Sequence, residues 1–250
     1  MSDTRGAPVA LVTGAASGIG RACAERFAED GWRLVLVDRR KDELGALAGL
    51  AEDVATVAGD VADAAANEAA VAEALTRFGR LDAAVANAGV VLAALVDESS
   101  DEDFDRLFDV NVRAVVHLAK AAHRPLAETK GSLTVMASKT GLVAQTNSPL
   151  YCATKGAAIQ LARALALDWA PEGIRVNAVC PGMVDTPMLA EYIDALPDSA
   201  AEWEKFRRAQ PLGRLATPRE IADVVFFLST PAAAFVTGVA LPVDGGFTAE

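Results

Sequence analysis

The amino-acid sequence predicts an α/β fold, built on a doubly wound parallel sheet of about seven strands with helices on both faces. Two observations support this prediction. Short apolar runs alternate along the chain with longer amphipathic stretches, as they do when crossover helices cover a parallel sheet. The first apolar run also leads directly into a glycine-rich loop.

Seven segments are expected to be strands, because each is short, apolar and bounded by glycine or polar residues. They are Val9–Gly14, Arg33–Asp38, Val54–Gly59, Leu81–Gly89, Ser132–Ser138, Ile174–Gly182 and Val239–Gly246. Stretches with helical periodicity lie between them, at Gly18–Asp30, Asn67–Phe78, Asp101–Leu126, Leu150–Trp169 and Pro218–Ser229. No linker, repeat or charge run interrupts this order, which predicts a single domain over residues 1–250.

The stretch 185–216 is the longest without an expected strand. Ligands of open α/β sheets bind beyond the carboxyl ends of the strands. An insertion after the sixth strand is therefore placed to close over a ligand as a substrate-binding lid. A surface helical hairpin is the alternative that the sequence leaves open.

Composition argues against several classes of protein. The chain carries 23 basic and 34 acidic residues, a formal net charge of −11, whereas nucleic-acid binding needs the opposite sign. No polybasic patch indicates a membrane surface, and the most apolar stretch, 224–243, is interrupted by Ser, Thr, Pro and Gly. The three cysteines form no C-x-x-C pair and the first residues lack a secretory pattern, so a cytoplasmic protein is expected.

The loop TGAASGIG, between the first strand and the first helix, is typical of a Rossmann-type dinucleotide site. Gly14 allows a sharp turn, Gly18 allows the backbone to approach a pyrophosphate, and Gly20 allows the helix to pack close to the sheet. The helix N-terminus then faces the phosphates. The spacing is G-x-x-x-G-x-G, and a glycine cluster alone could serve an ordinary turn.

Asp38, at the end of the second expected strand, indicates NAD as the cofactor. A carboxylate there can accept hydrogen bonds from the adenosine ribose and would repel a 2′-phosphate. Arg39 and Arg40 leave the alternative open, because they could bind a 2′-phosphate if Asp38 turned away. Asp60 and Asn87 follow the third and fourth strands, where they could contact the adenine and a ribose.

A catalytic pair is expected on the helix Leu150–Trp169. Tyr151 and Lys155 lie four residues apart, so both project from one helix face. A neighbouring ammonium and the positive ring of an oxidised nicotinamide both favour the phenolate. Tyr151 could then accept a proton in alcohol oxidation and donate one in carbonyl reduction. Ser138, at the end of the fifth strand, could hold the substrate oxygen near the phenol.

These motifs resemble those of the short-chain dehydrogenase/reductase family. TGAASGIG, ANAG, VNVRA, Ser138, YCATK, PGMVDTPM and PVDGG occur in the family's order and span nearly the whole chain. The one small departure is Ala86, where the family usually has a first asparagine. Lys139, directly after Ser138, is an unusual charge to which the motifs assign no role.

The resemblance implies a catalytic tetrad and a homotetramer. Asn111 would hold a water that links Lys155 to solvent, and Thr186 and the backbone near Val184 would hold the nicotinamide carboxamide. Similar proteins are commonly tetramers joined through the helices that carry Asn111 and Tyr151 and through the C-terminal strand. The catalytic residues expected are Asn111, Ser138, Tyr151 and Lys155. The cofactor residues expected, besides Tyr151 and Lys155, are Gly14, Ser17, Gly18, Ile19, Gly20, Asp38, Asp60, Val61, Asn87, Ala88, Gly89, Pro181, Gly182, Val184 and Thr186.

The leading hypothesis is reversible hydride transfer between NAD(H) and a secondary alcohol or ketone, with no metal, nucleic-acid or membrane partner. His117 and His123 are six apart on a helix, without the Asp or Cys neighbours that a metal site needs. The substrate residues expected are Ser138, Gln145, Tyr151, Met183 and Met188. A mainly apolar pocket is indicated by Met183, Met188, Leu189 and Leu142, to which Gln145 and Thr146 could add polar contacts. Alternatives are an NADPH-dependent 3-oxoacyl-type reductase and a dinucleotide-sensing protein without activity; a halohydrin lyase should have lost the glycine loop.

Overall fold

A single parallel sheet forms the centre of the computed structural model, which describes residues 6–194, 196 and 198–249. The described strands follow the order β3-β2-β1-β4-β5-β6-β7, and every neighbouring pair is parallel. The apolar runs of β1, β2, β4, β5 and β6 are buried on both faces, as in other helix-covered parallel sheets, whereas the edge strands β3 and β7 are partly exposed. The strands are β1 (Val9–Thr13), β2 (Arg33–Asp38), β3 (Val54–Ala58), β4 (Ala83–Ala86), β5 (Ser132–Met136), β6 (Arg175–Pro181) and β7 (Ala240–Val243).

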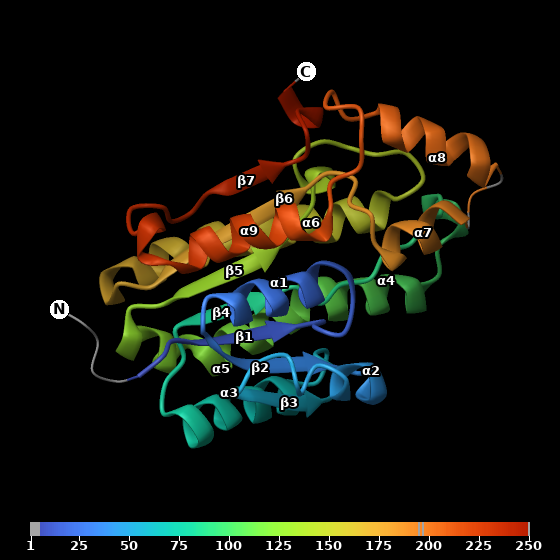
Figure 1. The fold of residues 1–250 in the computed structure, drawn as a ribbon. Coiled ribbons are helices and arrows are strands. Elements are labelled where there is room, and N and C mark those ends of the chain that lie inside the picture. The colour runs from blue at the N-terminus through green and yellow to red at the C-terminus, as the bar shows by residue number, and fades with distance from the viewer. Residues whose placement is uncertain (1–5, 195, 197, 250) are drawn as a thin grey trace.

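Helices cover both faces of this sheet (Figure 1). One apolar core joins one sheet face to α1 and α9, and a second joins the opposite face to α3, α5 and α6. The described helices are α1 (Gly18–Glu29), α2 (Lys41–Gly45), α3 (Ala64–Phe78), α4 (Asp101–Phe108), α5 (Ala114–Thr129), α6 (Pro149–Trp169), α7 (Pro187–Asp194), α8 (Ser199–Arg208) and α9 (Pro218–Ser229).

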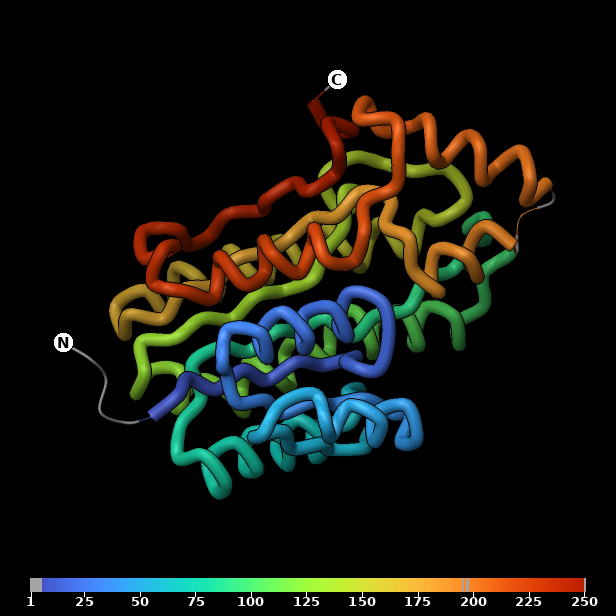
Figure 2. The backbone as a smooth tube through the Cα atoms, viewed as in Figure 1, coloured from blue at the N-terminus to red at the C-terminus, as the bar shows by residue number. Residues whose placement is uncertain are grey.

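The strand order reverses at β1, which pairs with β2 on one side and with β4 on the other. The chain therefore builds one half of the sheet first and then returns to build the second half, as the colours in Figure 2 show. In such a fold the crevice for a ligand lies where the order reverses, beyond the carboxyl ends of the strands. The helices α7 and α8 lie toward that end of the sheet.

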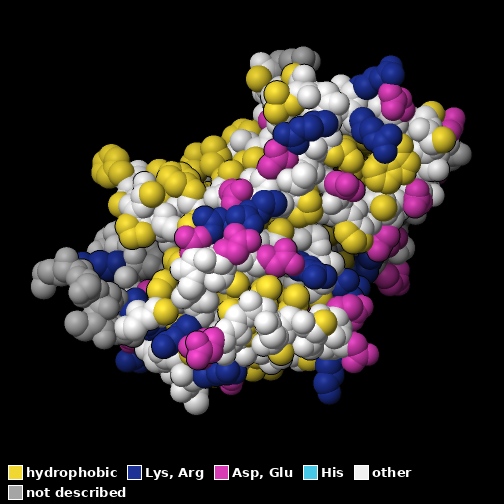
Figure 3. All heavy atoms as spheres, in the orientation of Figure 1, with side chains coloured by type: hydrophobic (Ala, Val, Ile, Leu, Met, Phe, Trp, Pro, Cys, Tyr) yellow, Lys and Arg dark blue, Asp and Glu magenta, His cyan; other side chains and the backbone are white. Residues whose placement is uncertain are grey.

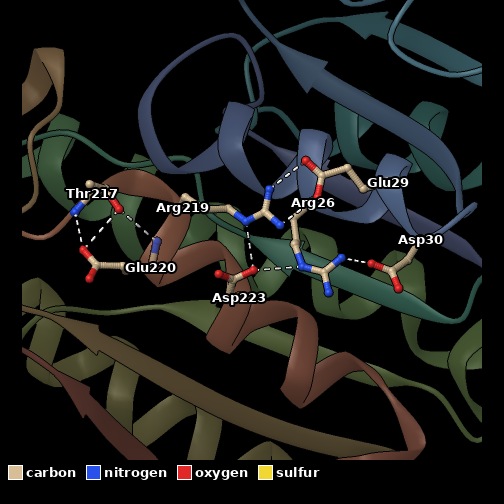
Figure 4. A network of polar contacts seen from close by, with 7 residues as sticks. All are labelled: Arg26, Glu29, Asp30, Thr217, Arg219, Glu220 and Asp223. Carbon is tan, nitrogen blue, oxygen red and sulfur yellow. Dashed lines mark hydrogen bonds and ion pairs between the residues drawn. The ribbon is translucent and has the colours of Figure 1, made fainter.

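An ion-pair network joins α1 to α9 on the outer surface (Figure 4). Arg219 lies 2.7 Å from Glu29 and 2.9 Å from Asp223, and Arg26 also pairs with Asp223 at 2.8 Å. The Arg26 guanidinium lies 3.9 Å from the ring centre of Phe226. Exposed pairs contribute little singly, but this network holds α9 against the helix that follows the glycine loop. Figure 3 shows the mixed acidic and basic side chains on this face.

The predicted fold class is confirmed, with differences at element ends. Several strands stop before the glycine that was expected to end them, because the loops beyond β1, β3, β4 and β6 line the crevice. The expected helix Asp101–Leu126 is wrong as one regular element: a π-helical turn, Asp109–Arg113, separates α4 from α5. The short helix α2 was not expected. The stretch 185–216 contains α7 and α8, and of its residues 195 and 197 lie outside the described part of the chain.

Candidate active site

The glycine loop between β1 and α1 is tightly packed. Gly14 and Gly18 have left-handed φ angles of +65° and +53°. A Cβ added to Gly20 would lie 2.1 Å from the carbonyl oxygen of Gly14, so only glycine allows α1 to begin this close to the strand. A Cβ added to Gly18 would lie 3.3 Å from Cγ2 of Thr186, across the crevice. The three glycines thus keep open the space that a pyrophosphate needs.

Asn87 and Thr13 fix the ends of β4 and β1 to each other. The Asn87 side chain donates hydrogen bonds to the carbonyl oxygens of Thr13, at 2.9 Å, and Gly14, at 3.3 Å. The buried Thr13 hydroxyl accepts from the backbone amides of Asn87 and Ala88. Asn87 therefore positions the glycine loop through its side chain. A direct contact between Asn87 and a ribose stays a prediction.

Asp38 is paired with Arg40 at the end of β2. One carboxylate oxygen accepts from the Ala16 amide at 3.0 Å, and the Arg40 guanidinium contacts both oxygens at 3.1 Å. Arg40 also donates to the Ser17 hydroxyl at 2.8 Å. Burial alone would raise the pKa of Asp38, but the hydrogen bonds from Arg40 and Ala16 outweigh it and hold this pKa below its ordinary value. The end of the crevice beyond β2 therefore holds an ionised carboxylate paired with the Arg40 guanidinium.

Asp60 and Val61 follow β3 and also line the crevice. One Asp60 carboxylate oxygen accepts a hydrogen bond from the Ala62 amide at 2.9 Å, which fixes the turn. The carbonyl oxygen of Val61 accepts from the side chain of Asn67 at 2.8 Å. Adenine recognition by Asp60 stays a prediction.

Ser138, just beyond the end of β5, lies together with Tyr151 and Lys155, which stand on the first turns of α6. The Ser138 hydroxyl accepts hydrogen bonds from the Thr140 amide at 3.2 Å and the Thr140 hydroxyl at 3.0 Å. The Lys155 ammonium, on the next turn of α6 after Tyr151, is 5.6 Å from the centre of the phenol ring. It donates to the carbonyl oxygen of Met136 at 2.9 Å. These side chains are therefore held before any ligand binds.

Burial shifts the pKa values of both Tyr151 and Lys155. It raises the pKa of Tyr151 to about 12, although a hydrogen bond with Ser138 acts in the opposite direction. Burial also lowers the pKa of Lys155 to about 8. Burial is therefore the dominant influence on the pKa of the Tyr151 phenol. The positive ring of an oxidised nicotinamide would act against that burial.

Asn111 lies in the π-helical turn between α4 and α5. Its amide oxygen accepts from the Val90 amide at 2.9 Å, and its amide nitrogen donates to the Val90 carbonyl at 2.9 Å and the Thr154 hydroxyl at 3.1 Å. These contacts tie the segment after β4 to α6. Both hydrogens of the amide nitrogen are engaged, while the amide oxygen keeps a second acceptor position; a water relay at Asn111 stays a prediction.

The substrate side combines apolar residues with one amide. Met183 is buried, and Met188 on α7 is partly exposed. Gln145 donates to the hydroxyl of Tyr192, also on α7, at 3.0 Å. The other amide atom of Gln145 is buried and has no hydrogen-bond partner among the described residues. The amide therefore offers one unused hydrogen-bonding position beside the pocket.

One cavity of about 470 Å³ connects these groups. This volume lies in the range usual for cofactor and small-molecule sites. All the residues expected for the cofactor, the substrate and catalysis line it, except Gly20, which packs α1 against the loop, and Asn111, which lies behind Lys155. A dinucleotide fits the residues present, because glycines keep one wall open and polar strand ends face it.

Several contributing residues were not predicted from the sequence. Thr13 and Thr154 act through hydrogen bonds to backbone and side-chain groups that are distant in sequence, so no local pattern marks them. Tyr192 lines the cavity from α7. Arg40 was visible beside Asp38, but the pairing of the two needed the structure. Among the described residues, no three His, Cys, Asp or Glu side chains gather as metal ligands would.

The chain is similar along nearly its whole length to dehydrogenases and reductases. A family model described as enoyl-(acyl carrier protein) reductase matches residues 14–248. Meso-2,3-butanediol dehydrogenase of Serratia marcescens is 38% identical over 97% of this chain and 95% of that enzyme. L-fucose dehydrogenase of Mus musculus is 38% identical over 95% of this chain and 87% of that enzyme. A crystal structure of 3-ketoacyl-(acyl-carrier-protein) reductase from Brucella melitensis, complexed with NADH, superposes with a TM-score of 0.90 at 36% identity, covering 96% of this chain and 98% of that one.

The fold, the glycine loop and these relatives define a nicotinamide-dinucleotide-dependent oxidoreductase of alcohols and ketones. The chain belongs to the short-chain dehydrogenase/reductase family. None of the helices in the described part of the chain combines the length and the apolarity that a membrane span requires.

Proposed function

We propose that this enzyme transfers a hydride reversibly between NAD(H) and a secondary alcohol or ketone. The observation that carries the proposal is the meeting of Ser138, Tyr151 and Lys155 in the cavity that the glycine loop lines. When bound, the nicotinamide ring accepts the hydride in oxidation and supplies it in reduction. The protein residues bind the substrate oxygen and move its proton.

Tyr151 is the proposed acid/base. In oxidation the phenolate takes the hydroxyl proton as the hydride leaves the carbon, and in reduction the phenol returns that proton to the oxygen. Ser138 donates a hydrogen bond to the substrate oxygen and holds it near the phenol. Lys155 stabilises the phenolate with its charge, and its lowered pKa eases the passage of a proton to solvent. Asn111 supports this relay by fixing the turn behind Lys155.

NAD is the proposed cofactor, because Asp38 carries the negative charge at the adenosine end. A ribose hydroxyl reaches this carboxylate by replacing the Arg40 guanidinium, which is partly exposed. A 2′-phosphate would instead bring its charge against Asp38. The remaining expected cofactor contacts are also proposed. Asp60, Val184 and Thr186, for example, line the same cavity as Asp38.

Replacing Asp38 with Ser should narrow the difference between NADH and NADPH affinity by about 10-fold or more, because it removes one charge and frees the Arg40 cation. The two dissociation constants, measured by calorimetric titration, test this. Asp42→Ser is the matched control, since it removes an exposed carboxylate on α2 that does not line the cavity. An unchanged ratio in Asp38→Ser would mean that Asp38 does not face the ribose.

The oxidation rate should rise with pH in the alkaline range, because the active base is the phenolate of Tyr151. The pKa of about 12 in the unliganded chain falls when a positive nicotinamide binds, so the rise should occur below that value. Steady-state rates of oxidation and reduction across pH test this, and reduction should slow where oxidation accelerates. Enzyme held at each pH and assayed at neutral pH controls for denaturation. A flat alkaline profile would argue against phenolate catalysis.

An NADPH-dependent reductase of 3-oxoacyl groups is the second candidate. The observation that favours it is the Arg40 guanidinium, which hydrogen-bonds Ser17 beside the cavity and could face a 2′-phosphate. The paired Asp38 argues against it. Separate titrations with NADH and NADPH distinguish the two candidates.

The surroundings of the site complete the proposal. Residues 185–216 act as a lid, since α7 places Met188 and Tyr192 on the cavity wall.

The enzyme works in the cytoplasm, an inference supported by three cysteines that form no disulfide. It assembles as a homotetramer, which would cover the exposed Phe235 and Phe227 near β7 and Leu167 on α6. Figure 3 shows apolar side chains along the β7 edge.

A further inference from the structure

Lys139 is a buried cation at the active site for which the proposed mechanism has no use. It directly follows Ser138 and begins the short turn Lys139–Gly141. Only 3% of its surface is exposed. Burying a charged ammonium is costly unless a partner compensates it, so such a residue needs a reason.

No partner within the described residues satisfies the Lys139 ammonium. It takes part in no hydrogen bond or ion pair there, and it lies over the ring of Phe247, whose centre is 3.4 Å away. The charge of Asp244 acts on it from the C-terminal turn, while the Cys152 thiol lies on the α6 side. The Asp244 oxygens already accept from the Gly246 amide and from the amide and hydroxyl of Thr248, so they serve the C-terminal turn.

The position of Lys139 makes it available to a substrate. It lines the same cavity as Ser138, Tyr151 and Gln145. The ammonium lies over the Phe247 ring, which does not line the cavity, and by rotating its side chain of roughly 6 Å Lys139 can turn toward a substituent on a substrate held by the adjacent Ser138. Desolvation would strengthen its attraction for an anion.

The other cationic side chains either already have a hydrogen-bond or ion-pair partner or lie away from Ser138. Lys155 donates to Met136, and Arg106, which also lines the cavity, pairs with Asp103 at 3.5 Å. Arg39 and Arg40 lie at the adenosine end, beyond β2. The lid cations Lys205 and Arg208 pair with Glu202 and Glu204 on the surface and do not line the cavity. Lys139 is thus the cation beside Ser138 that is left for a ligand in the described structure.

We propose that Lys139 binds a carboxylate on the substrate, so that the enzyme oxidises secondary hydroxy acids and reduces the corresponding oxo acids. This inference rests on the proposed function. The carboxylate is held and stays unchanged. The hydroxyl-bearing carbon loses its hydride to the oxidised cofactor, its oxygen loses a proton to Tyr151, and a ketone forms. Lys139 sets specificity and takes no part in the transfer itself.

The test compares short secondary hydroxy acids with the methyl ester of each, using the full-length enzyme with NAD. The wild type should show kcat/KM for the acid about 100-fold above that for the ester, because only the acid pairs with a desolvated ammonium. Lys139→Gln should lose about 100-fold in kcat/KM for acids, mainly through KM, and change the esters less than about 3-fold. Lys130→Gln, which removes an exposed cation at the end of α5 that does not line the cavity, should change neither, and NADH affinity should stay the same throughout.

Two further measurements do not depend on turnover by the variant. Short aliphatic carboxylates should compete with substrate on the wild type far better than the matching amides. Lys139→Met should raise the unfolding temperature, because it removes an unpaired buried charge; a purely structural contact with Phe247 would make it fall. Equal losses for acids and esters in Lys139→Gln, or a wild type that turns over neutral alcohols and prefers the esters, would overturn the inference and leave the proposed function standing. No turnover of acids, esters or neutral alcohols would contradict the proposed function itself.

Discussion

Replacing Tyr151 with Phe should lower kcat by about 10³-fold and leave NADH binding close to that of the wild type. The substitution removes only the phenolic oxygen, so the ring still packs on the cavity wall. Lys155 keeps its hydrogen bond to Met136, and Ser138 keeps its contacts with Thr140. Steady-state rates and an NADH titration on the same preparations measure the two effects separately.

Phe247→Leu gives a control for this experiment, since it changes an aromatic ring of the C-terminal turn that does not line the cavity. It should keep most of the oxidation rate on neutral alcohols. Substantial turnover by Tyr151→Phe would contradict the assignment of the acid/base. Loss of NADH binding in that variant would mean that the oxygen serves the cofactor site instead.

Replacing Gly20 with Ala should abolish detectable NADH binding and destabilise the fold by about 3 kcal/mol. The new Cβ would lie 2.1 Å from the Gly14 carbonyl oxygen and 2.5 Å from the Asn87 side-chain nitrogen. These neighbours are backbone and a hydrogen-bonded amide, so α1 must move away from β1. The glycine loop would then lose the shape that holds a pyrophosphate. Denaturant unfolding and a calorimetric NADH titration measure the two effects.

Gly45→Ala is the matched control, because a Cβ at Gly45 would meet nothing within 4 Å. Gly45 lies in α2, where alanine is the better helix former, so this variant should be as stable as the wild type or slightly more. Normal NADH affinity in Gly20→Ala would show that the close approach of α1 and β1 is not needed for the cofactor site.

The sequence was sufficient for the fold class because the signals that determine it are local. A buried parallel strand appears as a continuous apolar run, and β1 and β2 were recognisable in this way. The helix α9 begins with Pro218 after a Thr217 cap, and its bounds were predicted exactly as they stand in the structure. Gly14, Gly18 and Gly20 marked the dinucleotide loop through their place between a strand and a helix.

Other features depend on contacts between distant segments and could not be predicted. The π-helical turn holds Asn111 where its side chain forms hydrogen bonds with Val90 and Thr154, and no periodicity reveals these contacts. The pairing of Asp38 with Arg40 depends on the path of the chain after β2. For Lys139 the sequence showed an unusual charge, but its burial and lack of a partner needed the packed C-terminal turn.

We have proposed that this enzyme oxidises secondary alcohols with NAD and that Tyr151 accepts the proton. The most direct measurement is the formation of reduced cofactor from secondary alcohols and hydroxy acids, with NAD and with NADP, by the wild type and by Tyr151→Phe. We expect turnover by the wild type, with kcat/KM at least about 10-fold higher with NAD than with NADP, and almost no turnover by the variant. Turnover with NADP alone, or equal rates for the wild type and the variant, would contradict it.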